Sequence, residues 1–295
     1  MESWPALEGG GLLEFFAFDI TIDDEEVLPL EYTSWRCNFP NGGQISWGDG
    51  TIETILPTST LSYLRHVYES IGEYRIVVFG CAGNMILNNS DHRQYLKRVL
   101  TPFPSTASVT PYRAFSYCTN LESLPLGLFS YATILGRDAR YICNHCQRLS
   151  DIPGDLFLNI DPTELVSAFE AVGYFLTEPV QIPSSLLWNC ASLTSVARIF
   201  EFANITEIPD ALFRDCEALK SATNAFSSTK IEAIPENIFA GCPGLTNLIE
   251  TFQSCSYVRG NVPELWISHP NANGTKCFNG VRFADNYNDI PSNWK

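Results

Sequence analysis

The sequence predicts an α+β protein in which a β-sandwich is followed by a solenoid of short helices and strands. The solenoid is indicated by a pattern that recurs along the chain: an Ile-Pro pair, two apolar residues, a cysteine and a leucine. Three copies begin at Ile182, Ile208 and Ile234, so successive copies start 26 residues apart. A fixed period of this size is typical of a solenoid, whose coils bury their apolar faces only by stacking on one another.

The apolar residues and cysteines of the pattern are predicted to point into the core. Side chains at positions i, i+1 and i+4 share one face of a short helix, and proline is well tolerated in its first turn. A thiol at the same place in every coil is expected to be a small core residue, with disulfides as the alternative. The predicted core positions are Leu186, Cys190, Leu193, Leu212, Phe213, Cys216, Leu219, Ile238, Phe239, Cys242 and Leu245.

The repeat pattern resembles the BspA-like leucine-rich repeats found in bacterial surface proteins and in bacteriophage proteins. Equivalent marks extend the pattern over residues 101–295, although the copy at Ile152 lacks the cysteine and the copy at Val262 carries Trp266. The resemblance implies a long, rigid surface that suits binding better than the enclosure of a reacting group.

Residues 12–100 show the marks of β-strands and tight turns. The stretch 16–22 alternates apolar and polar side chains, and Gly48 and Gly50 flank an aspartate in a tight turn. Trp47-Gly48-Asp49-Gly50-Thr51, followed by His66-x-Tyr68 and Gly72-x-Tyr74-x-Ile76, resembles the PKD domain family of immunoglobulin-like sandwiches. That resemblance implies a β-sandwich used as a spacer or binding module on surfaces and particles.

Charge and hydropathy exclude several classes of partner. The net charge of −15 argues against nucleic acid and against an anionic membrane surface, since both attract clustered Lys and Arg. No run of about 18 apolar residues is present, so membrane insertion is not expected. The first residues lack the features of a secretory leader, which favours assembly in the cytosol. A chain whose leader had been removed would read the same way.

Residues 1–11 are interpreted as an arm. Trp4, Pro5 and Leu7 would dock to a particle, and three consecutive glycines would form a flexible linker. The alternative is a terminal tail without a docking role.

Few residues point to chemistry. Asp23, Asp24 and Asp49 leave calcium binding open, because calcium takes clustered oxygen ligands. Cys143-x-x-Cys146 lacks the second pair that a structural zinc site needs. No catalytic motif, metal site or cofactor is expected.

Several aromatic residues fall outside the repeat positions and are candidates for a strip that stacks on sugar rings. Ordinary packing is the alternative interpretation. The candidates are Tyr174, Trp188, Tyr257 and Trp266.

The sequence therefore predicts a non-enzymatic structural protein of a bacteriophage virion, located on the head or the tail. Its arm would contact other virion proteins, and its repeats would bind glycan or protein on the host surface. A homo-oligomer is left open. The alternatives are a bacterial cell-surface adhesin of the BspA-like type and, from another class, a carbohydrate-active enzyme.

Overall fold

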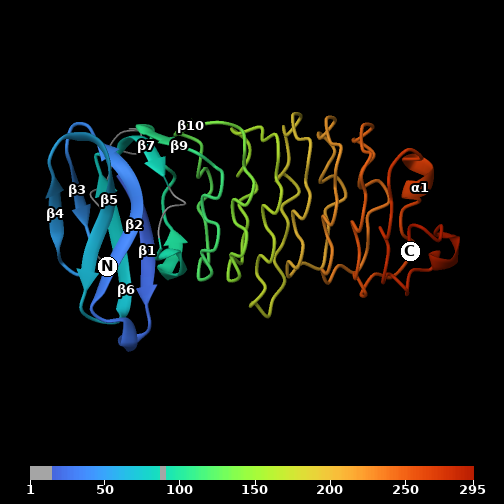
Figure 1. Ribbon diagram of the computed structural model, residues 1–295, viewed down its shortest axis with the longest axis horizontal. Helices are drawn as coiled ribbons and strands as arrows, with labels where there is room; N and C mark the ends of the chain where they lie inside the picture. The colour runs from blue at the N-terminus through green and yellow to red at the C-terminus, as the bar shows by residue number, and fades with distance from the viewer. Residues whose placement is uncertain (1–14, 87–90) are drawn as a thin grey trace.

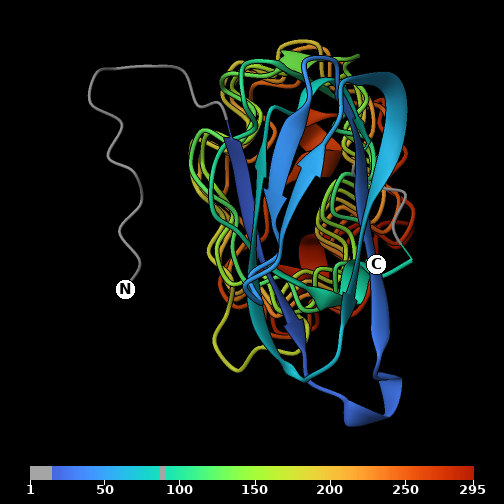
Figure 2. The ribbon, with the colours of Figure 1, turned by 90° about the vertical axis from the view of Figure 1, so that its left-hand side faces the viewer.

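The computed structural model describes residues 15–86 and 91–295, with two β-sheets at one end and a stack of coils extending from them (Figure 1). The predicted docking residues Trp4, Pro5 and Leu7 lie outside the described residues. Seen along the long axis, successive coils superimpose on one another behind the sheets (Figure 2). The molecule is thus a rod with a sheet-built end.

The first sheet has five strands in the order β4-β3-β6-β1-β8, in which all neighbours are antiparallel. Strand β1, which lies next to the central strand β6, carries the buried side chains of Phe16, Phe18, Ile20 and Ile22. Ala17 and Asp19 between them are buried as well, so burial does not follow the apolar–polar alternation of the sequence. The strands are β1 (Phe15–Ile22), β3 (Gly43–Ser46), β4 (Ile52–Ile55), β6 (Gly72–Phe79) and β8 (Leu96–Val99).

The second sheet has the order β10-β9-β7-β2-β5 and ends in two parallel pairs, β7–β9 and β9–β10, near the first coils. The predicted division of the chain at residues 100 and 101 stays a prediction. The strands are β2 (Leu30–Phe39), β5 (Thr58–Tyr68), β7 (Ala82–Ile86), β9 (Ala107–Val109) and β10 (Thr133–Ile134). Short 3₁₀ helices lie at η1 (Glu25–Val27), η2 (Arg93–Tyr95) and η3 (Tyr287–Asp289).

Aromatic rings join the two sheets into one core. Trp35 of β2 lies 5.2 Å from Phe16 and 4.7 Å from Phe18 of β1, measured between ring centroids. Tyr68 of β5 lies 4.2 Å from Tyr74 of β6. Rings of this size dominate the burial energy of a small sheet core.

The tight turn after Trp47 is built around backbone and aromatic contacts. Gly48 has a φ of +87°, and a Cβ there would lie 2.6 Å from the Arg75 amide nitrogen, which explains the glycine. The His66 ring stacks on Trp47 at 4.9 Å and its Nε2 lies 2.7 Å from the Asp49 carboxylate. Burial alone would raise the pKa of Asp49, but hydrogen bonds from His66 and Thr51 outweigh it and hold the pKa below its ordinary value.

The coils are built from β-turns, which corrects the predicted solenoid of short helices. In the coil from Pro209, the amides of Leu212, Arg214 and Cys216 each donate to the carbonyl three residues earlier. Among the described residues the sole α-helix is α1 (Leu265–Ser268), which has 4 residues. An α-helix needs uninterrupted i to i−4 bonds, and these segments do not form them. The fold is therefore β-rich with very little helix.

One side of each coil carries a repeated pair of residues with left-handed backbone, four positions apart. In one coil the pair is Asn224, with φ 53°, and Ser228, with φ 61°. Every second amide of this segment donates to a carbonyl of the next coil, for example Phe226 N to Thr251 O at 2.9 Å. We call these stacked segments the turn ladder: residues 113–117, 141–145, 167–171, 198–202, 224–228, 250–254 and 276–280.

The core of the rod lies between the turn ladder and the Ile-Pro side of each coil. Phe213 of the Ile-Pro side and Phe226 of the turn ladder meet edge to face at 6.2 Å. The predicted core positions named above are each at most 3% exposed. A column of rings runs along the axis through Phe169, Phe200, Phe226, Phe252 and Phe278, with centroids 5.4 to 5.8 Å apart.

All ten cysteines of the chain are buried and free. Burial raises the pKa of Cys190 and of Cys242 to about 12 and that of Cys255 to about 11. A protonated thiol is a poor nucleophile. Cys143 and Cys146 share this environment, and burial is also the main cause that raises the pKa of Cys146.

We expect the native protein to react with less than one equivalent of the thiol reagent DTNB near neutral pH. In guanidinium chloride the count should rise to all ten thiols, without a reducing agent. The two counts, measured by absorbance, distinguish core thiols from disulfides. A denatured count of four or fewer would contradict the packing described here.

Candidate binding site on the turn ladder

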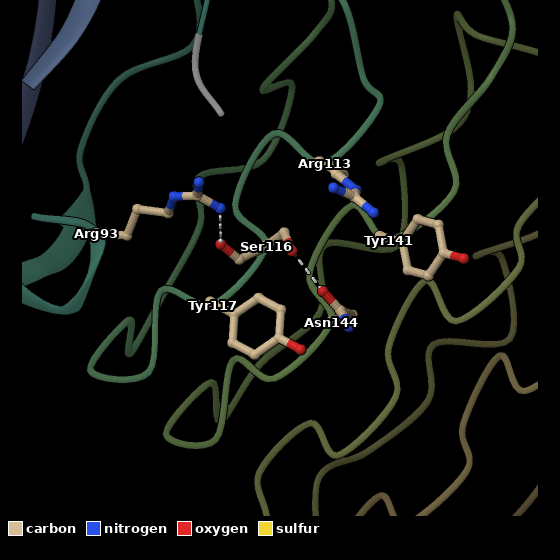
Figure 3. A pocket seen from close by; sticks show the side chains of 6 residues that line it. All are labelled: Arg93, Arg113, Ser116, Tyr117, Tyr141 and Asn144. Carbon is tan, nitrogen blue, oxygen red and sulfur yellow. Dashed lines mark hydrogen bonds between the residues drawn. The ribbon is translucent and has the colours of Figure 1, made fainter. Parts of the chain in front are cut away.

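A cavity of about 490 Å³ opens on the turn ladder where its first two segments adjoin η2. This volume lies within the range of about 300–1,000 Å³ that is usual for small-molecule sites. Figure 3 shows Arg93 and Arg113 on different sides of Ser116, with the Tyr117 ring beside Asn144. Its lining residues are Arg93, Arg113, Ser116, Tyr117, Tyr141 and Asn144.

Backbone geometry holds the exposed side chains of this site in place. Arg113, Tyr117 and Tyr141 have φ values of 55°, 62° and 59°, which L-residues rarely adopt. The amide of Arg113 donates to Arg140 O at 3.1 Å, and that of Tyr117 donates to Asn144 O at 2.9 Å. The hydrogen bonds between coils therefore stabilise a left-handed backbone conformation that these residues rarely adopt without such bonds.

Arg113 lies among aromatic rings. Its guanidinium carbon is 5.3 Å from the Tyr112 ring centroid and 5.0 Å from that of Tyr141, which are cation–π distances. Within residues 15–86 and 91–295, no carboxylate forms an ion pair with Arg113, and the cavity lining contains no Asp or Glu. The site is thus locally positive in a chain whose net charge is −15.

A buried polar pair forms part of the cavity lining. The Ser116 hydroxyl donates to Asn144 Oδ1 at 2.5 Å, and Arg93 Nη1 donates to the Ser116 carbonyl at 3.1 Å. Asn144 is 4% exposed, and its side-chain Nδ2 donates to no group of the described chain. Asn144 lines the cavity and its Nδ2 is not among the buried side-chain atoms without a partner, so this donor is open to the cavity and available to an acceptor on a ligand.

Aromatic side chains continue from this site along the turn ladder. Tyr117 is 54% exposed and stacks on the His145 ring at 4.7 Å. Phe202, three segments after that of Tyr117 and at the equivalent position, is 46% exposed. The rings of Tyr117 and Phe202 present flat apolar faces to solvent. The backbone that carries them is held by hydrogen bonds to the neighbouring coils.

The middle of the turn ladder is acidic. Glu201 is buried, and its Oε2 lies 3.3 Å from Arg198 Nε without forming a hydrogen bond. Burial raises the pKa of Glu201, Arg198 opposes the rise, and the charges of Glu170 and Glu250 add to it. The basic and aromatic end of the ladder therefore adjoins an acidic stretch.

We expect Glu201→Gln to raise the melting temperature near pH 8. A raised folded-state pKa contributes stability below the unfolded pKa, and that stability is lost as the pH rises through the folded pKa. The gain should shrink as the pH approaches the ordinary Glu value of about 4.3. Thermal melts of wild type, Glu201→Gln and the exposed control Glu236→Gln would show this. A lower melting temperature for Glu201→Gln at every pH would contradict the unfavourable burial.

The structure spreads the four candidate surface aromatics over different parts of the rod. Tyr174 and Tyr257 are exposed and each follows its turn-ladder segment by three residues, in non-adjacent coils. Trp188 is exposed on the Ile-Pro side, where the Arg214 guanidinium lies 5.8 Å from its ring. Trp266 is half-buried and contacts Phe278 at 6.2 Å and Trp294 at 6.3 Å. They do not form one continuous strip.

Two of the three residues considered for calcium binding, Asp24 and Asp49, form other contacts. Asp24 accepts from the Glu26 amide at the start of η1, and Asp49 contacts His66 and Thr51. In the described part of the chain no group of three or more His, Cys, Asp or Glu side chains could hold a metal ion. The same residues contain no helix with the length and apolar character that crossing a bilayer requires.

Comparison with known proteins finds a match for part of the coil stack. The family model of the BspA type leucine rich repeat region matches residues 176–262, in 6 copies. The match bears on the repeats alone and does not reach the two sheets. No curated protein and no solved structure matches the chain.

The residues of the cavity were not among the sequence predictions. The 26-residue pattern marks the inward positions, whereas Arg113, Tyr117 and Tyr141 point outward. Arg113 and Tyr117, like Tyr141 and His145, lie four residues apart, but this spacing alone does not indicate a site. Recognising it requires knowing that both members of each pair have left-handed backbone.

Proposed function

We propose that this chain is a non-enzymatic binding protein of the surface-adhesion type that presents its turn ladder to glycan or protein on a cell surface. BspA-type repeats occur commonly in proteins of that type. The observation that carries the proposal is the ladder itself, where inter-coil bonds keep exposed side chains such as Tyr117 and Phe202 in fixed register. A preorganised surface loses little entropy when it binds.

Cell binding tests the proposal directly. Fluorescently labelled protein should bind bacterial cells saturably in flow cytometry, and an excess of unlabelled protein should compete. Periodate treatment of the cells, which oxidises glycans, and protease treatment would distinguish the two kinds of receptor. Binding that neither saturates nor competes would contradict an adhesive role.

For the carrier of this surface we propose a bacteriophage virion, with the two sheets acting as a PKD-like spacer between the particle and the repeats. This rests on the resemblance of the Trp47 and His66 motifs and on their position before the repeats. A bacterial cell surface would use the same binding surface. Mass spectrometry should detect the chain in purified virions, whereas recovery by protease shaving of intact cells would favour the cellular alternative.

The non-enzymatic part of the proposal has its own test. Incubation with a panel of oligosaccharides should release no new reducing ends. Hydrolysis that disappears when one carboxylate is replaced would revive the carbohydrate-active alternative.

A further inference from the structure

We infer that the cavity bounded by Arg93, Arg113, Tyr117 and Asn144 binds an acidic sugar residue, with its carboxylate or sulfate on Arg113 and its ring against tyrosine. This inference rests on the proposed adhesive function and specifies its ligand class.

The charge of the lining selects an anion. The cavity has guanidinium groups on two sides, and the part of its lining that the structure describes contains no Asp or Glu. The planar guanidinium of Arg113 offers parallel N–H donors that match a carboxylate or sulfate, and no protein carboxylate in the described chain competes for them. Stacking between Tyr112 and Tyr141 restricts its orientation, which lowers the entropy lost on binding.

The side-chain amide of Asn144 supplies a second, independent indication of a ligand. Asn144 Oδ1 accepts the hydrogen bond from the Ser116 hydroxyl, so its Nδ2 is the amide atom left without a protein partner. Its Nδ2 therefore remains a donor at the cavity wall, in a residue that is 4% exposed. Hydroxyl and carboxylate oxygens of a sugar are acceptors for such a donor.

Aromatic surface favours a sugar over an acidic peptide. The Tyr117 ring is 54% exposed at the cavity, and the Tyr141 ring forms another wall. The apolar face of a pyranose ring packs on such rings, whereas an Asp or Glu side chain offers too little apolar surface to use both. The cavity volume of about 490 Å³ also exceeds what a single carboxylate side chain needs.

The test measures binding of defined probes to the full chain by calorimetry. The probes are a galacturonic acid trimer, a galactose trimer of the same linkage, a sulfated galactose trimer and a tetra-aspartate peptide. We expect the two acidic sugars to bind and the neutral sugar to bind at least about tenfold more weakly, with affinity falling as salt rises. The stronger of the two acidic sugars identifies the anion as carboxylate or sulfate.

Variants place the binding at this cavity. Arg113→Ala should lower the affinity for the acidic sugar about tenfold, and Arg113→Lys should lose part of it because one ammonium cannot form the bidentate pair. Tyr117→Ala should weaken acidic and neutral sugars alike. Arg282→Ala, an exposed arginine in a distant coil, is the matched control and should bind as wild type does. Melting curves confirm that each variant is folded.

Several outcomes overturn the inference: no acidic sugar binds, the neutral trimer binds equally well, tetra-aspartate binds more tightly than the sugars, or a folded Arg113→Ala retains full affinity. The failure of the proposed function looks different. A chain that binds the acidic sugar but not cells would support the cavity and overturn the adhesive role. A chain that binds cells equally with and without Arg113, and no acidic sugar, would overturn the cavity alone.

Discussion

Phe226→Ala should lower the free energy of unfolding by about 3–5 kcal/mol, the range measured for large aromatic side chains removed from cores. Phe226 is fully buried, and its ring lies 5.8 Å from Phe200 and 5.6 Å from Phe252 in the axial column. It also meets Phe213 across the core. The neighbouring coils are held by inter-coil hydrogen bonds, so they cannot collapse into the space left behind.

The matched control is Phe202→Ala. Phe202 belongs to the same turn ladder but is exposed, so the identical deletion should change stability by about 0.5 kcal/mol or less. Chemical denaturation followed by tryptophan fluorescence and by circular dichroism measures both variants. Equal losses for the two variants would show that the axial ring column does not hold the coils together.

Gly241→Ala should destabilise the protein by about 1–3 kcal/mol through a steric clash between coils. A Cβ at Gly241 would lie 2.2 Å from the Arg214 carbonyl oxygen and 2.9 Å from its carbonyl carbon, both backbone atoms of the preceding coil. A side chain could rotate away, but a backbone carbonyl moves only if the coil moves. The two coils must therefore separate, which weakens the hydrogen bonds and packing that join them.

Gly244 provides a control three residues further on. A Cβ at Gly244 would lie 3.6 Å from the Leu219 carbonyl oxygen, an ordinary contact distance. Gly244→Ala should therefore be neutral or stabilise the protein by about 0.4–1 kcal/mol, because it reduces the freedom of the unfolded chain. If melting temperatures fell equally for Gly241→Ala and Gly244→Ala, a propensity effect rather than inter-coil contact would explain both.

The repeat architecture was predictable because inward positions tolerate only apolar side chains. Phe213 and Cys216 recur in phase with Ile-Pro pairs for that reason, and the family match to residues 176–262 supports the repeat type. The backbone path was not predictable from the same residues. Apolar side chains four positions apart share a face in a helix and also in a run of β-turns, so Leu212 and Cys216 could not distinguish the two.

The candidate site was harder to predict from the sequence than the repeat architecture. Nothing in Arg113 or Tyr117 indicates a left-handed conformation, because such residues adopt it rarely and only where neighbouring coils enforce it. Whether a carboxylate of the described residues lies beside Arg113 depends on which coils are adjacent, and Asn144 is buried by contacts made between coils. The residue pattern within one repeat predicts the coil, whereas the site depends on how neighbouring coils stack on one another.

The hydrogen bonds of the turn ladder run from coil to coil, along the length of the rod (Figure 1). No disulfide links one coil to the next. A pulling force between the far end and the sheets would therefore act on every inter-coil interface at once, since each coil contacts only its neighbours and the interfaces lie in series. The weakest interface would then set the tension at which the rod begins to extend.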